Sequence, residues 1–211
     1  MGISVSKKWE RRWAIWAYII FMCSVSIVVL THTFIDGFGF HIDYTISRYV
    51  GLTPWSAIFF FVCNCVEAVL LYRYLQKVQK TWKMSPAWWF GVMLMLLTLI
   101  GLSMFPIGLF DKTWGEYGWV SWAHEICSKT MFVTAVLAGM ETVIKFRKDL
   151  FVRVFGFVFE VYGFFCVFMT LFNVQFFNDY VLVFEWLFLA MHMTLLVSIP
   201  KFSRANMELA E

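Results

Sequence analysis

Apolar residues gather in six long blocks along the chain, and short stretches that carry most of the charges separate them. The blocks cover residues 13–31, 56–72, 88–106, 123–144, 151–172 and 180–199. Each approaches or reaches the roughly 20 apolar residues that a helix needs to cross a bilayer. An isolated spanning segment must satisfy its own backbone, so all six are expected to be α-helices. The pattern predicts an all-α polytopic membrane protein, with residues 1–211 forming one six-transmembrane-helix bundle.

The composition agrees with a membrane protein. Hydrophobic residues make up 61% of the chain and charged residues only 15%, with a mean hydropathy of +0.73. A soluble domain usually carries about 25% charged residues. The second block is the shortest and contains Asn64 and Glu67. It is still expected to cross the membrane, because only then do the loops rich in lysine and arginine all lie on the same side.

Lysine and arginine are distributed unevenly between the loops. Fourteen of the 17 fall before the first block, after the second, between the fourth block and the start of the fifth (Arg153 included), or after the sixth. They are Lys7, Lys8, Arg11, Arg12, Arg73, Lys77, Lys80, Lys83, Lys145, Arg147, Lys148, Arg153, Lys201 and Arg204. The positive-inside rule then places both termini in the cytoplasm. The net charge of +3 fits loops beside anionic lipid, so no nucleic-acid partner is expected.

The stretch 101–132 joins the third and fourth blocks through a short aromatic loop. Pro106 and Gly108 are expected to end the third helix. Trp114, Trp119 and Trp122 follow, where a membrane interface would hold amphipathic rings. The loop is therefore expected to lie at the membrane surface.

Three ionisable residues open the fourth block: His124, Glu125 and Lys129. Glu125 and Lys129 stand at i and i+4 in the order that favours a helical ion pair, and His124 lies on the neighbouring stripe with Ser128. Two interpretations are open. The pair orients the helix, or the group forms a pocket for an anionic lipid headgroup with Lys129 as the cation.

Other polar residues lie deep within the blocks. Depths from a rise of about 1.5 Å per residue put Glu67, Glu160 and His192 near the bilayer midplane. Asn64 shares a helix face with Glu67, and Glu185 shares one with His192. Three interpretations are open: hydrogen bonding between helices, a polar site for a lipid headgroup, ion or proton path, or a catalytic metal site with Glu/Glu/His ligands.

Two further features concern the ends of the first block. Residues 32–55 form the longest loop, in which His32, Asp36 and His41 could bind a divalent metal or be solvated; their spacing is not that of a known closed site, so no metal is expected. At the N-terminus, Gly2 and Ser6 match the myristoylation pattern. Gly2 is therefore a lipidation candidate, which would make a eukaryotic protein a lipoprotein.

An ordered series of short motifs follows the first block. It comprises Tyr44-Thr45-Ile46-Ser47, Gly51, Phe59-Phe60-Phe61, Asn64, Tyr72-Arg73-Tyr74 with Gln76, Gly101-Leu102-Ser103, His124 and Phe132. In order and spacing it resembles the damage-regulated autophagy modulator (DRAM) branch of the Frag/DRAM/Sfk family of six-helix membrane proteins. Phe105-Pro106 and His124 are also similar to a related prokaryotic family of uncharacterised six-helix proteins.

This resemblance implies a six-helix protein with cytosolic termini and with no catalytic signature or cofactor that can be carried over. It implies residence in a lysosomal, Golgi or plasma membrane in a eukaryote, or in the cytoplasmic membrane of a prokaryote. Three functions are open: a non-enzymatic membrane protein of the autophagy-modulator type that acts in lipid organisation or through partners, a lipid-modifying intramembrane enzyme, and an accessory subunit of a larger membrane complex. Its expected partners are membrane lipids and other membrane-protein subunits.

Overall fold

The computed structural model of the protein describes residues 4–106, 119–172 and 174–208, and side chains from residue 12 to residue 199 with the same gaps. Within these residues the secondary structure is entirely helical. The helices are α1 (Ser4–Phe34), α2 (Ile46–Val50), α3 (Pro54–Trp82), α4 (Pro86–Met104), α6 (Trp119–Lys145), α7 (Leu150–Leu171), α8 (Gln175–Asp179) and α9 (Val181–Glu208).

Six of these helices are long and apolar enough to cross a membrane: the part of α1 from Arg12, α3, α4, α6, α7, and α9 as far as Ile199. This confirms the predicted all-α class and the six apolar helices, which indicate an integral membrane protein. Several helices continue past their apolar blocks. α1 begins at Ser4 rather than at residue 13, and α3 continues to Trp82 rather than ending at residue 72. Hydropathy marks the part that fits the membrane, whereas helical hydrogen bonding continues into charged sequence.

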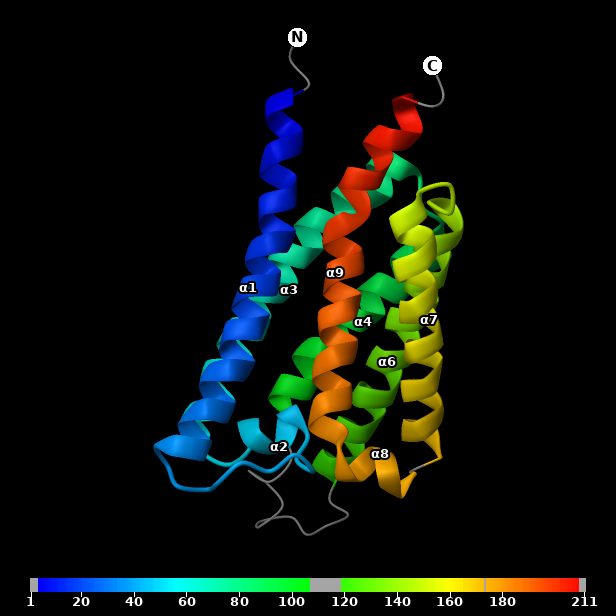
Figure 1. The fold of residues 1–211 in the computed structure, drawn as a ribbon. Coiled ribbons are helices and arrows are strands. Elements are labelled where there is room, and N and C mark those ends of the chain that lie inside the picture. The colour runs from blue at the N-terminus through cyan, green and yellow to red at the C-terminus, as the bar shows by residue number, and fades with distance from the viewer. Residues whose placement is uncertain (1–3, 107–118, 173, 209–211) are drawn as a thin grey trace.

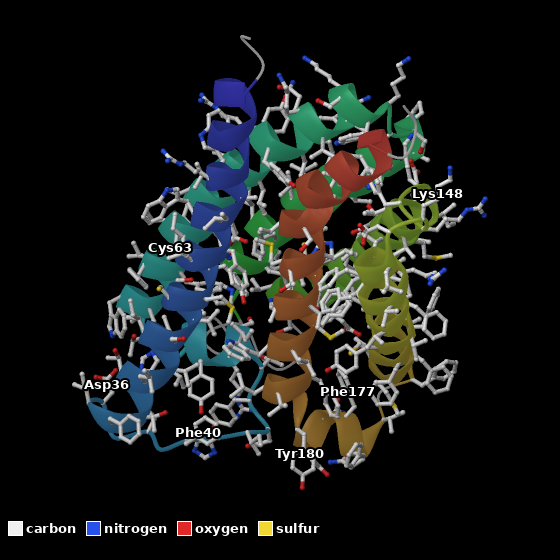
Figure 2. The ribbon with its side chains drawn as sticks, turned by 45° about the horizontal axis from the view of Figure 1, so that its top comes forward. Asp36, Phe40, Cys63, Lys148, Phe177 and Tyr180 are labelled. Carbon is white, nitrogen blue, oxygen red and sulfur yellow. The ribbon has the colours of Figure 1, made fainter. Side chains whose placement is uncertain are left out.

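The long helices run up and down as a bundle (Figure 1). α1 begins and α9 ends at one end, called here the terminal end, and α2 and α8 lie at the opposite end, the α2 end. α1 packs on α3, α3 on α4, α4 on α6 and α6 on α7, while α9 contacts α1, α6 and α7. Lys148 projects at the terminal end and Asp36 lies at the α2 end (Figure 2).

Local sequence signals set the helix starts. Ser85 caps α4 by accepting a hydrogen bond from Trp88 N, and Pro86 occupies the first turn, where no N–H is needed. Asp149 caps α7 through Phe151 N at 2.8 Å and Val152 N at 3.3 Å. These caps fix where α4 and α7 begin, and the chain reverses direction in the short segments before them.

Glycines bring α6 and α7 close together. A Cβ added at Gly139 would lie 2.5 Å from Glu160 Oε1, and one added at Gly156 would lie 2.5 Å from Val143 Cγ2. At Gly163 the added Cβ would be 2.7 Å from Val136 Cγ2. Small residues permit such close contacts between membrane helices, where dispersion and hydrogen bonding rather than water exclusion hold helices together.

Residues 32–55 are more ordered than a solvated loop. His32 belongs to the last turns of α1 and is fully buried, which corrects its assignment to the loop. Thr45 caps α2 by accepting from Arg48 N at 3.0 Å, and Ile46, Tyr49 and Val50 of α2 are buried. The segment therefore packs onto the bundle because α2 carries an apolar face.

Candidate functional site

The three ionisable residues at the start of α6 do not form one site. His124 is 6% exposed and faces the bundle interior. Glu125 and Lys129 lie on the outer surface of α6, with side chains 60% and 35% exposed, and their Oε1 and Nζ are 2.5 Å apart. The expected ion pair is present. Successive residues are about 100° apart around a helix, so His124 faces the bundle interior while the ion pair faces outward.

His124 links three segments at the α2 end. Its Nδ1 lies 2.8 Å from the carbonyl oxygen of Phe105, after α4, and 3.3 Å from Ser47 Oγ in α2. A carbonyl oxygen can only accept, so Nδ1 carries the hydrogen in the tautomer that fits this contact. The histidine therefore ties α6 to the ends of α4 and α2.

A cavity of about 50 Å³ lies beside His124, and we call it the first cavity. By this measure it has room for roughly three or four water molecules. Its polar side chains are Ser47, Asn64, His124, Ser128 and Glu185, and its walls are Phe21, Ile46, Val50, Phe60, Leu99, Leu102, Met131, Phe132 and Leu189. These residues come from α1, α2, α3, α4, α6 and α9, so the first cavity lies between most of the helices of the bundle.

Asn64 reaches the first cavity from α3 and is 1% exposed. Its Nδ2 donates a hydrogen bond to Ser103 Oγ, and Ser103 in turn donates to Leu99 O at 3.0 Å. Asn64 Oδ1 is buried and has no hydrogen-bond partner among the residues that the structure describes. A buried acceptor without a partner is costly, so this oxygen is suited to a donor that enters the cavity.

Glu185 lines the first cavity from α9 and also holds α2 in place. Its Oε2 accepts a hydrogen bond from the backbone N–H of Ile46 at 2.9 Å. Nearby, Leu182 N donates to Ile42 O at 3.3 Å. The free N–H groups of the first turn of α2 need acceptors, and a carboxylate is a strong one. Glu185 therefore fixes α2 over the cavity from a position 139 residues away in the chain.

A second cavity of about 20 Å³ lies deeper in the bundle and contains Glu67 of α3 and His192 of α9. These side chains are 2% and 3% exposed, as expected from an interior orientation. Phe21, Leu99, Met131 and Leu189 form walls of both cavities. The two cavities are therefore neighbours, and Glu185 and His192, seven residues apart on α9, line one each.

Glu160 does not join Glu67 and His192 in the second cavity. It is 9% exposed and lies on α7 against Gly139 of α6. Both carboxyl oxygens are buried, and no described residue forms a hydrogen bond to them. His192 instead stacks on Phe159, with ring centroids 5.6 Å apart. Of the three residues expected near the midplane, Glu67 and His192 therefore line one cavity, while Glu160 lies apart from it on the α6 side of α7.

Of the three residues considered as metal ligands, two form a pair and the third has other contacts. His32 Nδ1 pairs with Asp36 Oδ2 at 2.7 Å, whereas the His41 ring contacts Tyr44 and Phe38 O. Among residues 4–106, 119–172 and 174–208, no three His, Cys, Asp or Glu side chains gather as metal ligands would. Gly2, Lys112 and Trp114 lie outside the described residues.

Ser47 and His124 form a serine–histidine contact, but its geometry does not activate the serine. A nucleophilic serine must donate its proton to an unprotonated imidazole nitrogen. Here the contact is to Nδ1, which already donates to Phe105 O. The arrangement is suited to binding a polar group.

Sequence reasoning named Asn64, His124 and Glu185 but did not place them together, and it did not assign a role to Ser47, Ser103 or Ser128. Ser47 and Ser103 belong to the motifs that carry the family resemblance, so those motifs were the signal that could have identified them. Comparison of the chain with models of protein families, with curated proteins and with solved structures gives no match.

Proposed function

We propose that the chain is a non-enzymatic integral membrane protein similar to the autophagy-modulator branch, and that it binds the polar end of a membrane lipid in the first cavity. One observation carries this proposal. The motifs behind the resemblance are spread over residues 44–132, yet most of them contribute a residue to this cavity, Gly51 and the stretch around Arg73 being the exceptions. The lining residues from those motifs are Ile46, Ser47, Phe60, Asn64, Leu102, His124 and Phe132.

The polar groups of the cavity favour a ligand that donates hydrogen bonds. Asn64 Oδ1 is an acceptor without a partner, and Glu185 is an acceptor when ionised. Most of the other lining residues are apolar, as in ordinary ligand sites. A hydroxyl or amine at the polar end of a lipid has this chemistry. The volume suits such a group, while the acyl chains would remain outside the bundle.

Membrane lipids are thus the proposed partners, and lipid organisation is the proposed role. The exposed row of α7 provides a lipid-facing surface, with Leu150, Val154, Phe157, Val158, Val161, Phe164, Phe168 and Leu171. An accessory role would place another membrane-protein subunit on the same row. The lysosomal, Golgi or plasma membrane of a eukaryote, or the cytoplasmic membrane of a prokaryote, is the proposed location, following the resemblance.

The orientation belongs to the same proposal. Lys83 directly follows α3, Lys145 ends α6 and Arg153 lies in the first turn of α7. These helix ends lie at the terminal end of the bundle (Figure 1). The positive-inside rule would place this end in the cytoplasm. Epitope tags at either terminus should then be reachable only from the cytosol, and a tag beside Asp43 only from the opposite side. A tag at the C-terminus that is reached from outside would contradict the orientation.

Lipid binding is tested with Asn64→Leu, which removes the unpartnered acceptor. Ser103 keeps its hydrogen bond to Leu99 O, so the change leaves no new donor without a partner. We expect the affinity for hydroxyl- or amine-bearing lipid in nanodiscs to fall about fivefold to tenfold, the loss of one neutral hydrogen bond. Native mass spectrometry of the purified protein would show both the bound lipid and any second subunit.

Thr98→Val is the matched control. Thr98 is buried in α4, and its hydroxyl bonds only to Leu94 O and Met95 O of the same helix. This variant should keep the parent's affinity for lipid. Equal lipid binding by parent, Asn64→Leu and Thr98→Val would contradict the proposal, and a chain that purifies only with a second protein would favour the accessory role.

A further inference from the structure

Among the described residues that line the second cavity, only two have polar side chains, and both are ionisable. Glu67 enters it from α3 and His192 from α9. Counted from Pro54 and Val181, they lie about 20 and 17 Å from the α2 end at 1.5 Å per residue. The two groups therefore reach one cavity at the same depth, close to the middle of the bundle.

Each group has a buried polar atom without a partner. Glu67 Oε2 and His192 Nε2 are both inaccessible, and neither forms a hydrogen bond to any described residue. A carboxylate and an imidazole across a small cavity complement each other, because one can hold the proton that the other accepts. The cavity volume of about 20 Å³ exceeds the 10–15 Å³ or so that one water molecule needs, and such a water requires at least two polar partners.

We propose that Glu67 and His192 form an internal proton-binding site, in which one proton is shared between the carboxyl and the imidazole through a water molecule in the second cavity. In one arrangement Glu67 carries the proton and His192 is neutral. In the other the proton has crossed the water, leaving a carboxylate facing an imidazolium. The net charge of the site is the same in both arrangements, which keeps an unpaired charge out of the membrane interior.

Apart from Glu67 and His192, the described residues that line the second cavity have no titratable side chain. The cavity is otherwise lined by Phe21, Leu71, Met95, Leu99, Met131, Ala135, Leu189 and Met193. α4 has no titratable residue. The other elements around the cavity also carry titratable groups within about two turns of a lining residue. These are Tyr18 and Cys23 of α1, Cys63, Cys65, Tyr72, Arg73, Tyr74 and Lys77 of α3, His124, Glu125, Cys127, Lys129 and Glu141 of α6, and Glu185 of α9. Glu160 on α7 adjoins the Phe159 that His192 stacks on. None of these groups lines the second cavity.

The first cavity supplies a route by which water and protons reach the pair. Asn64 lines the first cavity and stands one turn from Glu67 on α3. The two cavities also share four wall residues. The proton site is independent of the proposed lipid binding, since its two groups lie outside the first cavity.

The test uses the ¹⁵N signals of His192 in the full-length protein in nanodiscs, assigned with His192→Gln. If the proton is shared, Glu67→Gln should shift the Nε2 signal toward that of a neutral imidazole with a free nitrogen, because the amide cannot take part in the exchange. Glu160→Gln is the matched control. Glu160 is also buried and without a hydrogen-bond partner, but it does not line the cavity. It should leave the His192 signals in place.

Two results would overturn the proposal: His192 signals that are the same in Glu67→Gln and in the parent, or signals that shift equally in Glu67→Gln and Glu160→Gln. A second measurement needs no variant at position 67. In the unaltered protein, magnetisation should transfer from water to the His192 imidazole. A dry cavity would give no transfer, and the shared-proton site would then be wrong even if Glu67→Gln failed to fold.

Discussion

Buried polar groups have different surroundings in the two regions of the bundle that lie on either side of α9. On one side, toward α1 and α3, it lines both cavities with Glu185, Leu189 and His192. On the other side, toward α6 and α7, Phe188 packs against Phe132 and Phe159, with ring centroids 4.6 and 5.6 Å apart. The first region keeps space beside its polar atoms, while the second is closed by aromatic rings and glycine contacts.

The difference lies in the small residues. Gly139, Gly156 and Gly163 let α6 and α7 approach closely, and Glu160 between them lines neither the first nor the second cavity. No such glycine stands between α3 and α9, and the side chains there meet with gaps. A buried carboxyl beside a cavity can bind a water or a ligand, whereas one sealed by packing can only remain neutral. Burial alone therefore does not identify a functional residue in this protein.

The largest expected effect comes from breaking the closed region with Gly163→Ala. The added Cβ would lie 2.7 Å from Val136 Cγ2 and 3.4 Å from Phe188 Cε2. Valine has a stiff branched side chain, so the helices must move apart. We expect the free energy of unfolding to fall by about 2–3 kcal/mol, the upper part of the range for overpacking. Thermal unfolding in detergent would measure this as a loss of roughly 4–12 °C for a chain of this length.

Gly91→Ala is the matched control for that substitution. Its Cβ would lie 3.9 Å from Thr134 O, an ordinary contact. Alanine also favours helix more than glycine does, by up to about 1 kcal/mol. The control should therefore be neutral or slightly stabilising. If both alanine variants melt alike, close packing does not hold α7 to α6.

The next largest effect is expected from Glu185→Ala, at the contact that holds α2 beside the first cavity. This change leaves Ile46 N without its acceptor, and a buried amide without a partner costs about 1–2 kcal/mol. α2 should loosen, and protease should cut residues 35–53 faster than in the parent. Glu185→Gln keeps an accepting oxygen and should resist cleavage as the parent does. Equal cleavage of all three proteins would show that α2 is held by its apolar face alone.

The six long helices could be predicted because lipid requires long apolar segments, and the sequence shows them directly. The short helices α2 and α8 could not, since five residues give no periodic signal. His32 was placed in a loop because polar residues follow it closely, yet Phe38 and Trp55 pack around its ring. The end of α3 was also set too early, because Arg73 and Lys77 end the apolar block but not the helix. The end of α4 was set two residues too late.

The candidate site could be predicted only in part. Helical spacing alone separates His124 from Glu125 and places Asn64 with Glu67. It cannot show that Glu185 binds Ile46 or that Asn64 binds Ser103, because these contacts join distant helices. It also cannot separate Glu160 from Glu67, since both lie at similar depth and only packing between helices distinguishes them. The register of neighbouring helices was the missing information.

A smaller effect is expected from Glu160→Met, which sharpens the difference between sealed and cavity-lining carboxyls. Both oxygens of Glu160 are without hydrogen-bond partners, so methionine removes unsatisfied groups at similar size. The free energy of unfolding should rise by about 1 kcal/mol. Glu160→Gln keeps polar atoms in place and should bring no gain. A loss of stability in the methionine variant would mean that Glu160 has a partner, such as a water molecule.

The smallest effect is expected from Lys129→Met, at the ion pair on the outer surface of α6. If this pair lay in a buried pocket, losing its cation would leave Glu125 as an unpaired charge and cost about 1–3 kcal/mol. The Glu125 side chain is instead 60% exposed, two turns from Trp119 at the start of the helix, and the pair lines neither cavity. Exposed pairs of this kind contribute little, so we expect a loss of about 0.5 kcal/mol.

Lys129→Met also tests whether the ion pair is only structural or binds a lipid headgroup. Lys129 Nζ is already 2.5 Å from Glu125 Oε1, which neutralises it as a cation for an anionic lipid. The amount of anionic lipid that co-purifies should therefore be equal for Lys129→Met, for the charge-conserving Lys129→Arg and for the parent. A lower amount in Lys129→Met alone, at unchanged melting temperature, would show that lipid headgroups bind at this outer surface.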